Sequence, residues 1–265
     1  MVRVLFLWHS LHQYMQMRAR NRCNHRDYQN IGVNGARITA SLPLVESLAR
    51  SADADHPLLV VLALIGNDVC NGHAGASHMT TVDSFHDHAI ETLSALDAKV
   101  PPNSFVLTVS LVDGRVLWNS MHDKQHPVGS SYAQLYNFLD CCGEINPCWG
   151  WLNSDETWRN FTSERAFNLS SVYSDIQGTQ SFENFTLLHW DPDFQSLMDE
   201  YVEETGGDPS DIIEPSDGFH PSQLGNILLA GKMWEFLETN HPEALGPVNP
   251  HNDQIESLFG DQGGH

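Results

Sequence analysis

An aspartate and a histidine stand three positions apart in the stretch EPSDGFHPSQLGN, residues 214–226. Within one turn, this spacing lets the carboxylate of Asp217 accept a hydrogen bond from Nδ1 of His220, while Nε2 acts as a general base. The alternative is a polar loop that caps the following helix, with Pro221 in its first turn. If the chain supplies suitable partners, the pair predicts base-assisted nucleophilic chemistry.

Two further motifs offer hydrogen-bond donors of the kind that such chemistry needs. In NIGVNGAR, residues 30–37, two glycines three apart permit a tight turn and an unobstructed backbone N–H at Gly35. In IGNDVCN, residues 65–71, the amide of Asn67 follows a strongly apolar run, where it can meet an oxyanion. Each of these two motifs alone is more typical of an ordinary turn. Together, in this order along the chain, the three motifs are much more specific.

The nucleophile is the open question. Ser10 follows the apolar run in VRVLFLWHSL, but Trp8 and His9 precede it, where a glycine usually makes room for an exposed serine. No G-x-S-x-G turn is present as a substitute, and only 25 positions separate Ser10 from Gly35. Two hypotheses stay open: a rebuilt nucleophile at Ser10, or a nucleophile on a segment upstream of this sequence. The residues favour the second.

Apolar runs alternate with helical patterns, which predicts an α/β fold with a parallel sheet covered on both faces. Ligands bind at the carboxyl ends of the strands in such sheets, so the polar motifs should follow strands. We expect one α/β domain over 1–245, with an irregular insertion over 113–160. An extended arm over 246–265 is expected to follow this domain. If the chain folds alone, the strand over 2–7 must belong to the sheet. The expected strands are 2–7, 28–33, 57–65, 104–111 and 185–190, and the expected helices are about 37–51, 81–98, 131–140, 161–177, 193–204 and 221–240.

Composition limits the possible partners of this chain. Its 265 residues carry 13 basic and 34 acidic side chains, a formal net charge of −21. A nucleic-acid partner requires a basic patch, which the sequence lacks, and an anionic membrane repels such a surface unless a cation mediates the contact. No apolar run reaches the roughly 20 residues that span a bilayer. The chain has no C-x-x-C zinc spacing, and His73, His78, His86 and His88 fit solvated positions better than a metal site.

Cysteines and sequons favour the secretory pathway. Cysteines at 23, 70, 141, 142 and 148 accompany N-x-[ST] sequons at 160, 168 and 184, although the sequence shows no convincing signal peptide. We expect Cys23 to pair with Cys70, and Cys148 to pair with Cys141 or Cys142. Trp149 and Trp151, beside that cysteine, either line an acyl-chain cavity or pack the insertion.

The three motifs resemble blocks two, three and five of the SGNH (GDSL-type) esterases. This resemblance implies a three-layer, flavodoxin-like α/β/α fold. It also implies that Gly35 and Asn67 are oxyanion donors, His220 the general base and Asp217 its orienting partner. Longer strings are similar to the large, catalytic subunit of the acyloxyacyl hydrolase family. They are RNRCNHRDYQNIGVNGAR, IGNDVCNG, YAQLYNFLDC, TSERA, EPSDGFHP and FGDQGGH.

That resemblance implies an esterase that removes secondary fatty acyl chains from lipid A of lipopolysaccharide, and also implies phospholipids as further substrates. It implies secretory or lysosomal handling and a saposin-like lipid-binding partner segment. The saposin-like segment, the calcium-binding region and the Gly-Asp-Ser block of that family are missing from this sequence, so we expect an incomplete chain without a cofactor of its own. The alternatives are a non-catalytic lipid- or glycolipid-binding relative and an SGNH esterase for another acyl ester.

Overall fold

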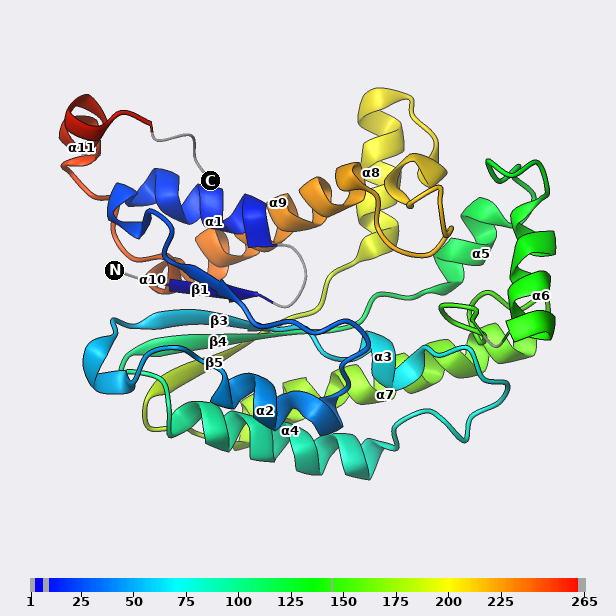
Figure 1. The fold of residues 1–265 in the computed structure, drawn as a ribbon, viewed down its shortest axis with the longest axis horizontal. Coiled ribbons are helices and arrows are strands. Elements are labelled where there is room, and N and C mark those ends of the chain that lie inside the picture. The colour runs from blue at the N-terminus through cyan, green and yellow to red at the C-terminus, as the bar shows by residue number, and fades with distance from the viewer. Residues whose placement is uncertain (1–2, 7–9, 144, 262–265) are drawn as a thin grey trace.

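A parallel sheet forms the centre of the molecule in the computed structural model (Figure 1). The structure describes residues 3–6, 10–143 and 145–261. Within them the sheet has five strands in the order β2-β1-β3-β4-β5, and every pairing is parallel. The chain is therefore α/β, as the sequence predicts. The strands are β1 (Arg3–Phe6), β2 (Tyr28–Asn30), β3 (Leu58–Leu62), β4 (Ser104–Val109) and β5 (Phe185–Trp190).

Strand β3 shows why both faces of the sheet are covered. All its residues are buried, as the continuous apolar run predicts. Because side chains alternate along a strand, Leu58, Val60 and Leu62 enter one hydrophobic core, and Leu59 and Val61 enter the other. The sheet therefore separates two apolar layers that helices must close.

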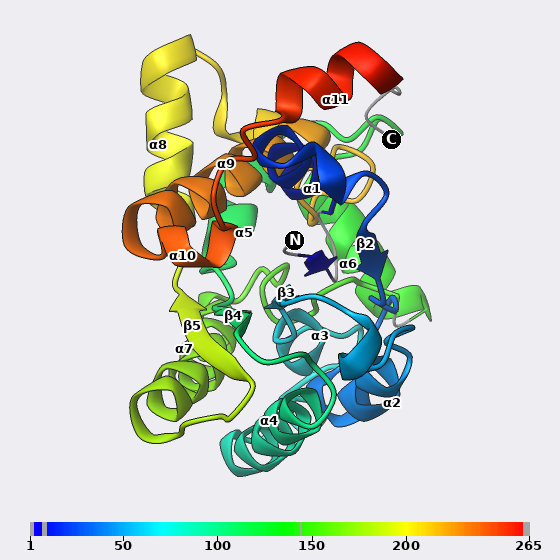
Figure 2. The ribbon, with the colours of Figure 1, turned by 90° about the vertical axis from the view of Figure 1, so that its left-hand side faces the viewer.

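Helices close both layers (Figures 1 and 2). One face carries α1, α9 and α10, and the opposite face carries α2, α4 and α7. The helices are α1 (Ser10–Arg20), α2 (Ser41–Glu46), α3 (Gly66–Val69), α4 (Val82–Asp97), α5 (Arg115–Met121), α6 (Tyr132–Gly143), α7 (Glu156–Thr179), α8 (Phe194–Thr205), α9 (Gln223–Asn240), α10 (Pro242–Leu245) and α11 (Asn252–Phe259).

The first strand confirms the expectation drawn from the apolar run over 2–7. Strand β1 pairs with β2 on one side and with β3 on the other. It therefore occupies an interior position of the sheet, and it supplies hydrogen-bonding partners to backbone groups that would otherwise be buried without them.

Two segments differ from the sequence expectation. Helix α5 lies inside the insertion over 113–160 that we expected to be irregular, in addition to the predicted helix α6. The expected extended arm over 246–265 contains helix α11 within its described part. Backbone and ion-pair contacts hold this helix against the end of α1: Arg22 pairs with Glu256 and Asp261.

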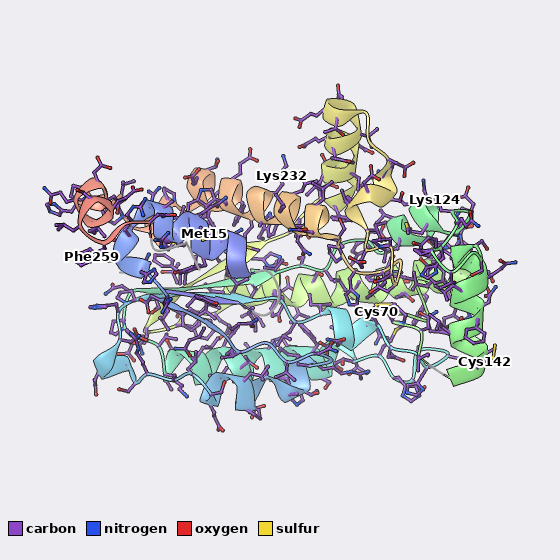
Figure 3. The ribbon with its side chains drawn as sticks, turned by 45° about the horizontal axis from the view of Figure 1, so that its top comes forward. Met15, Cys70, Lys124, Cys142, Lys232 and Phe259 are labelled. Carbon is purple, nitrogen blue, oxygen red and sulfur yellow. A yellow bond between two sulfur atoms is a disulfide. The ribbon has the colours of Figure 1, made fainter. Side chains whose placement is uncertain are left out.

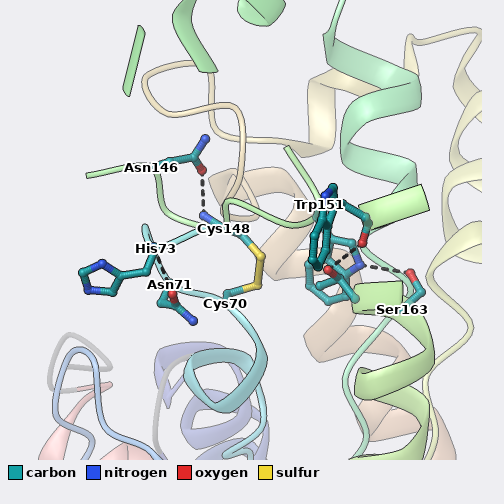
Figure 4. Close-up of a disulfide and its surroundings, with 9 residues drawn as sticks. Cys70, Asn71, His73, Asn146, Cys148, Trp151 and Ser163 are labelled. Atoms are coloured by element: carbon teal, nitrogen blue, oxygen red, sulfur yellow. Dashed lines mark hydrogen bonds between the residues drawn. A yellow bond between two sulfur atoms is a disulfide. The ribbon is translucent and has the colours of Figure 1, made fainter. Parts of the chain in front are cut away.

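The expected disulfide pairing is wrong. Cys70 pairs with Cys148, with Cα atoms 4.3 Å apart (Figure 4). Cys141 pairs with its neighbour Cys142. Cys23 is an exposed free thiol. The topology explains the correction, because Cys70 follows β3 at the carboxyl edge of the sheet, whereas Cys23 lies beyond α1, which returns the chain to the opposite edge. Figure 3 shows Cys142 at the outer edge of the molecule, on α6, well apart from Cys70.

Candidate functional site

The polar motifs meet where the order of the sheet reverses. In the strand order 2-1-3-4-5, ligands bind outside the carboxyl ends of the strands, at the switch point between β1 and β3. The chain leaves β1 toward α1 on one face of the sheet and leaves β3 toward α4 on the other (Figure 2). Ser10 is the first residue of α1 and so follows β1. Its side chain, and residues 7–9 before it, lie outside the described part of the structure.

The loops after β2 and β3 are joined at this edge. Gly35 adopts a left-handed backbone, with φ +78°, which side chains rarely tolerate. A Cβ atom at Gly35 would meet nothing within 4 Å, so the conformation and not crowding calls for glycine here. On α3, Nδ2 of Asn67 donates a 3.0 Å hydrogen bond to the carbonyl of Ala36. The amide nitrogen carries two hydrogens, and this bond occupies one of them.

Asp68 makes a second connection between the same loops, beneath the first. Its buried carboxylate accepts hydrogen bonds from the backbone N–H of Ile38, at 3.1 and 3.3 Å, and from Oγ1 of Thr80, at 2.7 Å. Burial raises the pKa of Asp68 to about 6, against the lowering effect of the hydrogen bonds from Thr80 and Ile38. The sequence motif named Asn67 but gave no indication of this role for its neighbour.

The structure brings the predicted aspartate and histidine together. Nδ1 of His220 lies 2.6 Å from Oδ2 of Asp217, and Oδ1 of Asp217 accepts from the backbone N–H groups of Phe219 and His220. Burial acts to raise the pKa of Asp217, but the hydrogen bond from His220 and the two backbone donors together lower it. A carboxylate that is ionised at neutral pH fixes the histidine tautomer with hydrogen on Nδ1.

The loop that carries this pair is held by residues of the insertion. Oη of Tyr132 donates to the carbonyl of Pro215 at 2.7 Å, and Oη of Tyr136 donates to the carbonyl of Gly218 at 2.8 Å. Nε2 of His126 lies 3.2 Å from the carbonyl of Ser216. All three side chains are buried. Sequence reasoning did not assign them, because the string that contains them gives no indication of the loop against which it packs.

A mostly apolar cavity of about 300 Å³ opens beside these groups. Asn67, Gly66 and His220 line it, together with Asn34 and Ala36 on either side of Gly35. Its described apolar lining includes Val109, Leu111, Trp151, Phe194, Leu229 and Met233. The volume is at the lower end of the roughly 300–1,000 Å³ typical of ligand sites. The arrangement therefore combines a histidine–carboxylate pair and amide donors with room for one apolar group.

The two tryptophans considered in the sequence, Trp149 and Trp151, occupy different environments. Trp151 lines the cavity and is buried, and it also lies beside the disulfide of Cys148 (Figure 4). Trp149 is half-buried and packs edge-on against Trp158, with ring centres 4.8 Å apart, and it is not among the described lining residues. Trp151 therefore lines a cavity, and an acyl chain as the occupant of that cavity stays a prediction. Trp149 instead packs within the insertion, as the alternative expects.

The histidines singled out in the sequence occupy other places. His73 and His78 stack on each other 4.3 Å apart, and His88 on α4 bonds the carbonyl of Ser84 at 2.7 Å. In the described residues, no group of three or more His, Cys, Asp or Glu side chains is placed to hold a metal ion. None of the described helices is long and apolar enough to cross a membrane.

A model of the GDSL-like lipase/acylhydrolase family matches residues 6–233. The chain belongs to this family, as the resemblance drawn from its motifs indicates. Within the family, it is similar to acyloxyacyl hydrolases: 44% identical to that of Oryctolagus cuniculus over 259 residues, 43% to that of Mus musculus and 42% to that of Homo sapiens over 258 residues each.

These alignments cover 95% of this chain but only 44–45% of the relatives, so the chain spans less than half their length. A crystal structure of a Bacillus subtilis protein, YXIM, aligns at 14% identity over 90% of this chain and 56% of that chain. Its TM-score of 0.44 makes that likeness too distant for any inference.

Proposed function

We propose that this chain is the catalytic part of a carboxylic-ester hydrolase that removes fatty acyl chains from a lipid. The observation that carries the proposal is the meeting of the Asp217–His220 pair and the Asn67 amide at one apolar cavity. Membership of a lipase and acylhydrolase family supports the reaction class. Similarity to acyloxyacyl hydrolases supports the finer proposal that the substrate is a secondary acyl ester of lipid A.

The proposed chemistry begins with a serine hydroxyl that loses its proton to Nε2 of His220 as its oxygen attacks the acyl carbonyl. Asp217 stabilises the imidazolium that forms. The backbone N–H of Gly35 and the second N–H of Asn67 donate to the developing oxyanion. The imidazolium then protonates the departing alcohol, which leaves an acyl-serine that a water molecule hydrolyses with His220 again as base.

Ser10 is the candidate nucleophile that this chain offers. It is the first residue of α1, the helix that follows β1, and β1 lies beside the switch point of the sheet. The helix that it starts presents backbone N–H groups at its first turn, where developing negative charge is favoured.

A second candidate function is non-catalytic binding of a lipid or glycolipid. The observation that favours it is the sequence before Ser10: Trp8 and His9 replace the small residues that usually expose a nucleophile. In this alternative the cavity receives an acyl chain, and no acyl-serine forms.

The proposal extends to the setting of the protein. Paired cysteines and the exposed sequon asparagine Asn168 support secretion or lysosomal delivery. A surface with net charge −21 repels the phosphates of lipid A. We therefore include in the proposal a saposin-like lipid-binding partner that presents the acyl chain. The proposal also includes a hydrolase domain over 1–245, followed by a C-terminal segment that contacts the end of α1.

The test is labelling of this chain by a fluorophosphonate probe, with mass spectrometry of the modified peptide. The proposal predicts a label on Ser10 that is lost in Ser10→Ala and in His220→Ala. Ser216→Ala, which removes an exposed hydroxyl from the loop of His220, is the matched control and should label normally. A folded sample that takes no label would overturn Ser10 as the nucleophile, and binding of fatty acids by that sample would favour the binding protein.

A further inference from the structure

Trp151 is held rigidly in the wall of the cavity by a buried hydrogen-bond relay (Figure 4). Its Nε1 donates to Oγ of Ser163 on α7 at 2.9 Å, and that Oγ lies 2.6 Å from Oδ1 of Asp113. Trp151 and Ser163 are 2% and 1% exposed. The relay therefore connects the wall of the cavity to the loop after β4, at the same edge of the sheet as the site.

The direction of the relay is fixed by the chemistry of its members. The indole nitrogen can only donate, and an ionised carboxylate can only accept. Burial acts to raise the pKa of Asp113, but hydrogen bonds from Arg115 and Ser163 outweigh it and lower the pKa. Ser163 must therefore donate to Asp113 and accept from Trp151, so each polar group has one role and the ring one orientation.

The backbone around the ring removes its remaining freedom. A Cβ atom placed on Gly114 would come within 2.0–2.5 Å of Trp151 ring atoms, so the indole lies directly on this backbone. Gly114 also lines the cavity. On the other side, the Cys70–Cys148 disulfide and the 2.9 Å bond from the N–H of Trp149 to the carbonyl of Asn71 fix the segment that carries the ring. Trp151 is thus a stiff boundary, unlike a side chain that moves aside for a longer ligand.

We propose that Trp151 sets the length of the acyl chain that the cavity accepts, and that Ser163 and Asp113 are positioning residues that hold it in place. This inference rests on the proposed function, because it takes an acyl chain as the occupant. A volume of about 300 Å³ gives space for on the order of ten groups the size of a water molecule or methylene, at ~30 Å³ each. It therefore suits one chain of medium length, and in this proposal the rigid indole limits that space, so a longer chain would have to displace it.

The test measures binding of saturated fatty acids from eight to eighteen carbons, by displacement of a fluorescent fatty acid from the full chain. Binding does not require a nucleophile, so the result is independent of turnover. For the wild type we expect affinity to rise about fourfold with each methylene and then to stop rising at a medium length. In Trp151→Leu the rise should continue for several further methylenes.

The positioning residues are tested in the same assay. Ser163→Ala removes the hydrogen-bond acceptor of the indole, and Asp113→Ala leaves the Ser163 hydroxyl free to rotate. In both variants, the chain length at which affinity stops rising should therefore be less sharply defined than in the wild type. Ser163→Thr keeps the hydroxyl and should therefore restore the sharp length limit of the wild type. Trp149→Leu is the matched control, because this tryptophan is two residues away and is not among the described lining residues.

The outcomes separate the inference from the function on which it rests. A folded Trp151→Leu with the length limit of the wild type overturns the inference and leaves the proposed function standing. A wild type that binds none of the fatty acids overturns the inference, and fluorophosphonate labelling of the same sample then decides separately on the proposed function. A limit shifted to longer chains in Trp151→Leu, and unchanged in Trp149→Leu, supports both.

Discussion

The side-chain amide of Asn67 and the carbonyl of Ala36 are joined by a hydrogen bond of 3.0 Å, although 31 positions separate them in the chain. The bond ties the loop after β3 to the loop that contains Gly35. Both proposed oxyanion donors are therefore placed by one contact at the switch point of the sheet. The relationship leads directly to a prediction for Asn67.

Asn67→Ala should lower kcat for ester hydrolysis, or the rate of fluorophosphonate labelling, by about 10²–10³-fold, the usual loss for one oxyanion donor. KM should change little, because the oxyanion exists only in the transition state. Asn71→Ala, which removes a nearby amide that accepts from the N–H of His73, is the control and should keep full activity. Equal losses in the two variants would contradict the role of Asn67.

Gly218→Ala should destabilise the loop of the Asp217–His220 pair. Gly218 has φ +64°, and a Cβ atom there would come within 2.3 Å of Oη of Tyr136. The left-handed conformation alone costs a non-glycine residue about 1–2 kcal/mol. We expect a lower Tm and slower labelling, both measured on the purified chain.

The same clash predicts a partial rescue. Adding Tyr136→Phe to Gly218→Ala removes the oxygen atom that is approached most closely, so part of the lost Tm should return. Gly178→Ala on α7 is the control, since its Cβ would meet nothing within 4 Å. It should be neutral or stabilising by up to about 1 kcal/mol. A Gly218→Ala protein as stable as Gly178→Ala would show that the contact is unimportant.

Asp68 should make folding stability depend on pH. Burial raises its pKa in the folded state to about 6, above the ordinary 3.8 that applies to the unfolded chain. Folding therefore favours the neutral carboxyl, and ionisation of Asp68 destabilises the folded state as pH rises from about 4 through 6. The size of the effect is on the order of 2–3 kcal/mol.

The measurement compares the free energy of unfolding of the wild type and of Asp68→Asn between about pH 4 and pH 7. All other titrating groups are common to both proteins, so the difference isolates this carboxyl. We expect the stability of the wild type relative to Asp68→Asn to fall as pH rises. A constant difference over this range would refute the prediction.

The Cys70–Cys148 disulfide closes a long loop, with a sequence separation of 78 residues. Cross-linking a loop of this length stabilises a protein by about 4.5 kcal/mol at most in the chain-entropy account. In the double variant Cys70→Ser, Cys148→Ser, the Tm should fall by roughly 10 °C. Labelling should also slow, because the bridge holds α3, which carries Asn67, to the segment of Trp151.

Cys141 and Cys142 provide the control for that experiment. These two cysteines are neighbours on α6, so their pairing closes no loop. Cys141→Ser with Cys142→Ser should leave the Tm within about 1–2 °C of the wild type. A matching loss of Tm in both double variants would contradict the argument from loop length.

Much of the fold could be predicted because hydrophobic periodicity is a local signal. The run over 57–65 predicted a strand buried on both faces, and β3 is such a strand. Helix α5 escaped prediction because its residues lie in a stretch rich in turn formers, and its helical state depends on packing against distant parts of the chain. The Cys70–Cys148 pairing could not be predicted, because it depends on which edge of the sheet each cysteine reaches.

The candidate site divides in the same way. Asp217 and His220 are close in sequence, so their contact could be predicted from spacing alone. The bond from Tyr136 to Gly218 joins residues 82 positions apart, and no local pattern indicates it. The orientation of the Trp151 indole likewise depends on its hydrogen bond to Ser163 on α7, which the sequence pattern does not indicate.

The interior position of β1 has a consequence for the order in which the molecule assembles. Among the described strands, β2 pairs with β1 alone, while β1 also pairs with β3. The β3–β4–β5 ladder can form without the beginning of the chain, but β2 has no edge to join until β1 has docked. The turn at Gly35 is thus connected to the rest of the sheet only through β1, so sequence changes in the four residues of β1 reach the site by way of β2.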